Sequence, residues 1–221
     1  TLRIHRDLTP IIFANIGTTM TEGKDDITKI RQIFAGLAIS QSYIHSDAAL
    51  CGFIAPFLAP RPAFDFADGA DSISISGHKF IGSPIPCGIL LALKRHVDRI
   101  ARSIAYIGNL DTTITGSRNG LTPLILWLAI KRFGEAGFRS RVEQSLEMAE
   151  YARCCLREIG VEAWRNPNAI TVVFPSPAPE LCKKWQLASA EGQSHILVMP
   201  NISRVQIDSF VADLARERRS S

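Results

Sequence analysis

The stretch Ser74-Ile-Ser-Gly-His-Lys-Phe-Ile-Gly-Ser-Pro-Ile-Pro-Cys-Gly88 joins the end of an apolar strand to a loop that is dense in glycine and proline. A single His-Lys pair, His78 and Lys79, stands where the strand ends. Desolvation penalises an ammonium group, so a lysine at a strand end in a closing site becomes a nucleophile towards an aldehyde. Lys79 is therefore a candidate nucleophile, and the competing interpretation is an ordinary solvated lysine.

Short apolar runs and helical patterns alternate on both sides of this stretch. Residues 10–16 predict a buried strand, and apolar residues at helical spacing over 27–37 predict a helix after Asp25 and Asp26. Further strands are predicted at 42–46, 71–75 and 88–93. This succession predicts an α/β fold with a mostly parallel sheet and helices on its faces.

The later part of the chain has a different character. Residues 122–133 predict one helix, and a longer helix is predicted after Gly137, ending at Gly160. A strand at 169–174, a helix through Trp185, a strand at 195–199 and a helix from Ser203 follow. Their alternation predicts a small C-terminal α+β domain.

Two other segments place polar side chains at strand ends. In Tyr43-Ile-His-Ser-Asp-Ala-Ala-Leu50, Asp47 is followed by two alanines, which leave room for a flat ring beside the carboxylate. An Asp that caps the following turn is the alternative. In Asn15-Ile-Gly-Thr-Thr19, two hydroxyls end a strand where α/β sheets receive ligands, although threonine after glycine is also ordinary turn chemistry.

Composition excludes several classes of protein. Of 221 residues, 46% are hydrophobic and 21% charged, which is typical of a soluble globular protein, and the net charge of +4 includes no basic stripe for nucleic acid. The most apolar run, residues 121–130, is about half the length of a membrane span. The five cysteines have no metal-ligand spacing and no even disulfide count, so we expect no metal and a reducing cytoplasm.

Taken together and in order, the motifs resemble group II pyridoxal-phosphate-dependent decarboxylases. The segments are Asn15-Ile-Gly-Thr-Thr, His45-Ser-Asp-Ala-Ala, Ser76-Gly-His-Lys and Gly116-Ser-Arg-Asn-Gly. The Ser76 to Gly88 stretch is most similar to the branch of bacterial histidine decarboxylases and plant serine decarboxylases, and the resemblance extends to Trp185-Gln-Leu-Ala and Val198-Met-Pro. It implies a fold type I, aspartate aminotransferase-like architecture, with the later portion of the large α/β domain at 1–135 and a connecting helix and small domain at 136–221.

The resemblance also implies roles for the matching residues. Lys79 would bind pyridoxal 5′-phosphate covalently, Asp47 would keep the pyridine nitrogen protonated, and Ala49 would pack against a ring face. His78 and Ser76 would lie near the phosphate.

Other positions have less definite roles. The resemblance puts Thr19 near the ring substituents and Tyr106 in a mobile loop, where it would return a proton to the substrate carbon. Tyr106 as a packed aromatic is the alternative, and His45 is interpreted as structural. Arg118 would pair with a carboxylate or with a partner subunit, and Leu121 replaces a histidine usual in this branch.

The expected activity is decarboxylation of an L-amino acid by a cytoplasmic homodimer, histidine to histamine first and serine to ethanolamine second. The family's Gly- and Ser-rich phosphate-binding turn and its ring-stacking histidine have no counterpart here, so we expect half a cofactor site and little activity from these residues alone. The alternative is a catalytically silent fragment that acts at most as a dimerisation or interaction piece.

Overall fold

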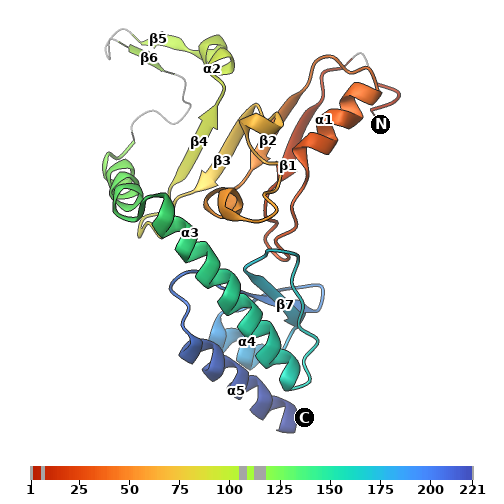
Figure 1. Cartoon of the computed structure of the whole chain (residues 1–221), viewed down its shortest axis with the longest axis vertical. Coiled ribbons are helices and arrows are strands. Elements are labelled where there is room, and N and C mark those ends of the chain that lie inside the picture. The colour runs from red at the N-terminus through yellow and green to blue at the C-terminus, as the bar shows by residue number, and fades with distance from the viewer. Residues whose placement is uncertain (1, 6–7, 105–108, 112–117, 221) are drawn as a thin grey trace. The chain divides into compact units, whose positions relative to one another are not determined.

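The computed structural model describes residues 2–5, 8–104, 109–111 and 118–220 (Figure 1). The chain divides into two compact units. The first unit contains residues 1–16, 24–55 and 62–132, and the second contains residues 17–23, 56–61 and 133–221. Two short segments from the first half of the sequence, residues 17–23 and 56–61, therefore belong to the second unit. The predicted division into 1–135 and 136–221 does not include this exchange of segments.

The first unit is built on a four-stranded sheet in the order β1-β2-β3-β4. The strands are β1 (Ile11–Asn15), β2 (Tyr43–Asp47), β3 (Ser72–Ser76) and β4 (Gly88–Ala92). β1, β2 and β3 are parallel, and β4 runs antiparallel to β3. The predicted α/β class with a mostly parallel sheet is confirmed.

The two faces of this sheet differ in polarity. Ile44 of β2 and Ile73 of β3 are buried on one face, where an added Cβ at Gly52 would lie only 2.6 Å from Ile75 Cγ1. Alternate residues point to the other face, which therefore carries His45 and Asp47. One face of the sheet thus packs in the core, and the other presents the polar residues.

Helix α1 (Ile27–Gly36) lies in the connection between β1 and β2, and it begins as the sequence predicts. The Asp26 side chain accepts a hydrogen bond from the Lys29 backbone N–H at 3.0 Å, which caps the helix. The longer connection from β2 to β3 contains three 3₁₀ turns, at Cys51–Phe53, Ala55–Phe57 and Phe66–Asp68. Helix α2 (Lys94–Ile100) and the short strands β5 (Arg102–Ile104) and β6 (Asn109–Asp111) follow β4 and were not predicted.

Helix α3 (Leu121–Glu158) contains one break, at Gly134. Its φ of 59° and ψ of −171° are non-helical and lie in a region that side chains disfavour. The sequence had indicated that the second helix starts after Gly137. That boundary is wrong, because the helix resumes directly after Gly134 and Gly137 lies inside it.

The second unit has an antiparallel sheet in the order β7-β9-β8, formed by β7 (Thr171–Pro175), β8 (Ala188–Ala190) and β9 (Gln193–Leu197). Helices α4 (Pro179–Trp185) and α5 (Arg204–Ser220) alternate with these strands. The core joins the later turns of α3 to β7 and α5 through buried side chains that include Leu156, Val172, Phe174 and Phe210. This is the predicted α+β arrangement, with β8 as an additional strand.

Three further features bear on function. Within the described residues, no helix combines the length and the hydropathy needed to cross a bilayer. In the same ranges, histidine, cysteine and acidic side chains form no group of three or more that would hold a metal ion. All five cysteines are free thiols.

Candidate active site

The carboxyl ends of β2 and β3 bring the predicted residues of the first unit to one edge of the sheet. The strands are parallel, with Asp47 paired to Ser74, so both end at the same edge. The Ala48 N–H donates to the Ser74 carbonyl at 2.9 Å, and the Ser76 N–H donates to the Ala49 carbonyl at 3.2 Å. Asp47, Ala49 and Ser76 are therefore held together at the edge where ligands bind in α/β sheets.

The Asp47 carboxylate is half-buried, and only one of its two oxygens has hydrogen-bond partners among the described residues. Its Oδ1 accepts the Ala49 N–H at 3.2 Å and lies 3.5 Å from the Ser74 hydroxyl. Asp47 thus caps the turn after β2, which was the alternative interpretation of this residue. Its Oδ2 has no hydrogen bond to any other described residue, so one oxygen stays available to a ligand.

A histidine and two serines support this carboxylate. His45 Nδ1 lies 2.7 Å from the Ser72 hydroxyl and Nε2 lies 3.0 Å from the Ser74 hydroxyl. The Phe13 ring packs edge-on against the imidazole at 5.2 Å between centroids. These contacts agree with a structural role for His45. Sequence reasoning missed Ser72 and Ser74, although a spacing of two residues puts both on one face of a strand.

The turn that carries Lys79 is fixed by its backbone. The Gly77 N–H donates to the Cys87 carbonyl, and the Ser83 N–H donates to the Gly77 carbonyl, both at 3.0 Å. A Cβ at Gly77 would lie 2.6 Å from Cys87 Sγ and 2.8 Å from Leu126 Cδ2, so a larger residue there would displace these side chains. Lys79 itself is half-buried. Its amine forms no hydrogen bond or ion pair with the rest of the described chain.

His78 and Ser76 flank this lysine. The His78 side chain is exposed, and its Nδ1 lies 3.2 Å from the Cys87 backbone nitrogen and 3.1 Å from the Cys87 carbonyl oxygen. The half-buried Ser76 has no side-chain hydrogen bond within the described residues. The proximity of these two side chains to a phosphate stays a prediction.

Thr19 lies in a loop of the second unit, residues 17–23. The neighbouring Thr18 hydroxyl accepts the Gly23 N–H at 2.8 Å, and the Glu22 N–H donates to the Thr18 carbonyl at 2.8 Å. Thr18 therefore closes the loop. The exposed Thr19 hydroxyl makes no hydrogen bond with another described residue, and its contact with a cofactor stays a prediction.

Sequence reasoning missed the anchor of this loop. Glu22 is fully buried, and its Oε2 accepts the Ile170 N–H at 2.8 Å, the Thr171 N–H at 2.9 Å and the Thr171 hydroxyl at 2.8 Å. The Asn166 amide also donates to the Thr21 carbonyl at 2.8 Å. No local pattern identifies such a contact, because the partners are 148 and 149 residues apart in sequence.

For the remaining predicted site residues, the structure gives few contacts. Tyr106 lies outside the described residues. Arg118 is exposed, and Leu121 begins α3 with about half of its surface exposed (52%). The Asn119 side chain accepts the Thr122 N–H at 2.9 Å and so caps the first turn of this helix.

The side chains at this edge suit pyridoxal phosphate. An amine without a protein partner is able to bond to an aldehyde, and a carboxylate with one open oxygen accepts a hydrogen bond from a protonated ring nitrogen. The small side chain of Ala49 stands beside that carboxylate and leaves space for a flat ring.

Comparison with known proteins points in the same direction. The conserved domain of pyridoxal-dependent decarboxylases matches residues 2–174. The histidine decarboxylase of Mesorhizobium japonicum is 50% identical over 215 residues, which are 97% of this chain and 58% of that protein. The histidine decarboxylase of Morganella morganii is 48% identical over 208 residues, covering 93% of this chain and 55% of that protein.

A solved structure, L-methionine decarboxylase from Streptomyces sp. 590, superposes with a TM-score of 0.85 at 29% identity, covering 97% of this chain and 54% of that one. The glutamate decarboxylase of Lactobacillus brevis shares the fold, with a TM-score of 0.79 at 21% identity over 95% of this chain and 54% of that one. The chain thus spans little more than half the length of these relatives.

Proposed function

Because this chain belongs to the pyridoxal-dependent decarboxylases, we propose that it is the lysine-bearing part of an enzyme that converts L-histidine to histamine and carbon dioxide. Serine, which would give ethanolamine, is the second candidate substrate. One observation carries the proposal. On the turns that follow two neighbouring strands, the Lys79 amine has no partner among the described residues, and the Asp47 carboxylate has one oxygen without a hydrogen bond. The 50% identity to a histidine decarboxylase supports histidine as the first choice.

Each residue of the edge has a separate task in this proposal. Bound pyridoxal phosphate supplies an electron sink for the electrons left when carbon dioxide departs. Lys79 holds the cofactor through Nζ, and Asp47 keeps a proton on the ring nitrogen. Ala49 supports a ring face, while Ser76, His78 and Thr19 contact the phosphate and the ring substituents. Tyr106 delivers a proton to the α-carbon after carbon dioxide has left.

The assembly and the cellular compartment are part of the same proposal. Leu124, Trp127 and Leu128 follow one another at helical spacing on α3 and are 57%, 57% and 58% exposed. An apolar helix face of this kind is typical of an interface, and we assign it to a second copy in a homodimer. Free thiols are the form that a reducing cytoplasm maintains. We keep residues 1–135 and 136–221 as the proposed functional division.

The direct experiment is a decarboxylation assay on the longest natural form of the protein, with L-histidine and L-serine as separate substrates and amine release as the readout. Faster formation of histamine is expected. A clear preference for serine would change the substrate and leave the reaction class intact. Failure of the protein to bind pyridoxal phosphate would favour the alternative, a silent interaction piece.

A further inference from the structure

A second polar pocket lies at the opposite end of the first unit's sheet from Lys79. It has a volume of about 740 Å³ and is bordered by residues at the amino end of β2, such as Ser42 and Tyr43, and by Asp71, which precedes β3. Cavities of about 300 to 1,000 Å³ commonly hold small molecules. Asp47 and Ser76, by contrast, are the last residues of these strands, so the pocket is separate from the candidate active site.

The centre of this pocket is the Asp71 carboxylate, whose side chain is only 4% exposed. Its Oδ2 accepts Arg31 Nη2 at 2.7 Å and the Ile44 N–H at 2.9 Å. Its Oδ1 lies 3.1 Å from both Arg95 Nη2 and His96 Nε2. A carboxylate has about four acceptor positions, so Asp71 is saturated by its neighbours.

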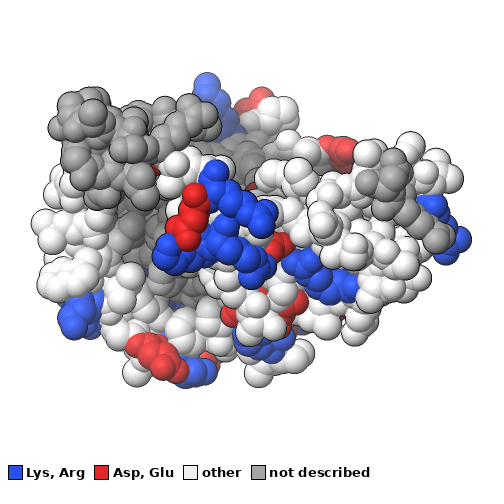
Figure 2. All heavy atoms as spheres, turned by 90° about the horizontal axis from the view of Figure 1, so that it is seen from above, with Lys and Arg blue, Asp and Glu red and all other residues white. Residues whose placement is uncertain are grey.

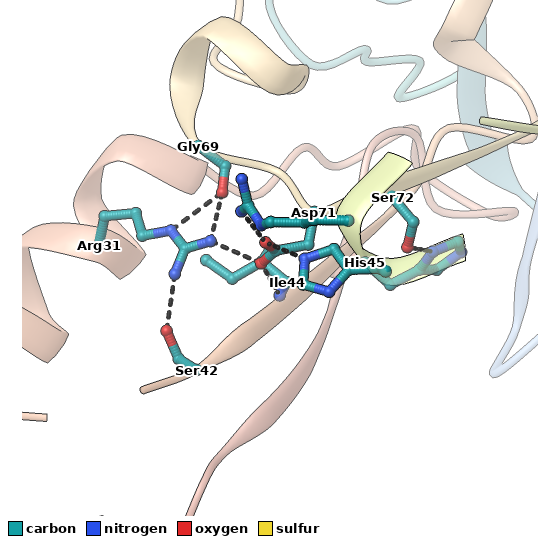
Figure 3. A network of polar contacts seen from close by, with 9 residues as sticks. Arg31, Ser42, Ile44, His45, Gly69, Asp71 and Ser72 are labelled. Atoms are coloured by element: carbon teal, nitrogen blue, oxygen red, sulfur yellow. Dashed lines mark hydrogen bonds and ion pairs between the residues drawn. The ribbon is translucent and has the colours of Figure 1, made fainter. Parts of the chain in front are cut away.

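The hydrogen-bond donors of Arg31 are likewise taken up by neighbouring residues of the fold. Its guanidinium reaches from α1 to the Gly69 carbonyl, to the Ser42 hydroxyl at 2.6 Å and to Asp71 (Figure 3). These contacts leave Arg31 and Asp71 as structural groups that shape the pocket wall. Neither offers a free site to a ligand.

Two arginines of α2 remain available. Arg95 is 63% exposed and has one ion pair, with Asp71. Arg99 lies four residues later on the same helix, also lines the pocket and forms no ion pair with another described residue. Lys94 and Asp98, in contrast, neutralise each other at 2.6 Å. In the view of Figure 2, Lys and Arg side chains gather in one patch, with acidic side chains among and beside them.

The charges in the pocket do not balance. Among its described lining residues, three guanidinium groups face one carboxylate, which leaves an excess of two positive charges when His96 is neutral. Like charges four residues apart on a helix destabilise each other, so Arg95 and Arg99 gain from an anion placed between them. Guanidinium groups bind phosphate oxygens through paired hydrogen bonds.

We propose that this pocket binds a small phosphate-bearing anion, held by Arg95 and Arg99 of α2 beside the saturated Arg31–Asp71 pair. Tyr43 and Phe66 line the same pocket and offer apolar surface to the remainder of such a molecule. The proposal is independent of the decarboxylase proposal, since it uses none of the residues assigned to that reaction.

Inorganic pyrophosphate is the probe, and calorimetric titration of the longest natural form of the protein is the measurement. We expect saturable binding of one pyrophosphate per chain that weakens as sodium chloride is added, because exposed charges are screened. The double variant Arg95→Gln/Arg99→Gln should weaken it at least about tenfold, the loss expected when one charge-assisted hydrogen bond is removed. Both arginines are exposed, so the fold should survive, and circular dichroism checks this.

Two control variants locate the binding. Lys94→Gln lies on the same helix and removes one positive charge outside the pocket, so it should leave the affinity within about twofold. Lys79→Gln tests whether pyrophosphate instead occupies the cofactor end of the sheet, and it should leave the affinity unchanged. Loss of binding in Lys79→Gln with retention in the arginine double variant would overturn the proposal. So would the absence of saturable heat up to about 10 mM pyrophosphate, beyond which affinities are too weak for a built site.

Discussion

Lys79 combines a fixed backbone with a side chain that has no partner in the described structure. The hydrogen bonds of Gly77 and Ser83 hold its turn, while its amine stays available. We expect borohydride reduction of the longest natural form, loaded with cofactor, to attach the cofactor at Lys79, and Lys79→Ala to remove the visible absorbance and most of the turnover.

Peptide mapping after reduction is the measurement. Lys94→Ala is the control, because that lysine is already paired with Asp98 and should not take the label. Label on a different lysine, or full activity in Lys79→Ala, would contradict the assignment.

Asp47 has two roles that one substitution separates. Asp47→Asn keeps an oxygen that is able to cap the Ala49 N–H, but a neutral amide does not hold a proton on a ring nitrogen. We expect turnover to fall by about two orders of magnitude or more with little change in the circular dichroism spectrum. Ser74→Ala, which removes the hydroxyl's contacts with Asp47 at 3.5 Å and with His45 Nε2 at 3.0 Å but keeps the carboxylate, should have a much smaller effect. Nearly normal turnover in Asp47→Asn would show that the residue is a turn cap alone.

At the scale of secondary-structure elements, Asp71 joins α1, β2 and α2 to the start of β3. Burial alone would raise the pKa of Asp71. Hydrogen bonds from the Ile44 N–H, Arg31 and His96 outweigh that effect, so the pKa lies below its ordinary value of 3.8. A carboxyl whose pKa is depressed by folding stabilises the folded state above its unfolded pKa and loses that contribution as pH falls through the folded value.

We therefore expect Asp71→Asn to lower the free energy of unfolding by about 2 to 3 kcal/mol at neutral pH, because Arg31 loses a charge-assisted hydrogen bond. The difference from the wild type should shrink only when the pH falls below 3.8 towards the folded pKa. Urea unfolding of both proteins at neutral and at acidic pH measures it. A difference that is the same at both pH values would show that charge is not the cause.

Glu22 connects the loop at 17–23 to the start of β7 within the second unit. Its φ of 55° is in the region that favours glycine, so Glu22→Gly relieves backbone strain while it removes the carboxylate, whereas Glu22→Ala removes the carboxylate and keeps the strain. Loss of three hydrogen bonds should cost about 2 to 4 kcal/mol in Glu22→Ala and about 1 kcal/mol less in Glu22→Gly. Hydrogen exchange at the Ile170 and Thr171 amides reports the loss directly. Unchanged protection in both variants would show that the carboxylate does not anchor the loop.

The sequence predicted those elements whose signals are local. Asp26 indicates the start of α1 because a cap acts within three residues, and β1 and β4 each contain a short apolar run. The apolar residues of β4 do not indicate the direction in which this strand runs, so its antiparallel pairing with β3 could not be predicted from the sequence. Gly134 and Gly137 are close in sequence, and only Gly134 has a non-helical backbone, so the residue types alone did not locate the break in α3. Glu22 depends on a partner in another part of the chain, which a window of sequence does not contain.

At the scale of the whole molecule, the face of the four-stranded sheet that carries His45 and Asp47 also exposes large apolar side chains. Ile11, Phe13 and Leu90 lie on the same face as Asp47 and are 65%, 68% and 69% exposed. β1 and β4 are the two edge strands of this sheet, and edge strands with exposed apolar side chains promote association.

The purified 221-residue chain should therefore self-associate, and Phe13→Ser/Leu90→Ser should reduce its light scattering at a given concentration. Val205→Ser is a matched control, since this side chain is 72% exposed but lies on α5. An equal reduction by the control, or a monodisperse wild type, would contradict this explanation.

The alternation of side chains along β2 also determines where the chain tolerates a change in length. One residue inserted within Tyr43–Asp47 would turn Asp47 towards the buried face and bring a neighbour to its place, because consecutive strand residues point in opposite directions. An insertion in the long connection between β2 and β3, near Arg61 for example, leaves that alternation intact. Natural variation in length should therefore accumulate in this connection, while the five-residue strand keeps its length.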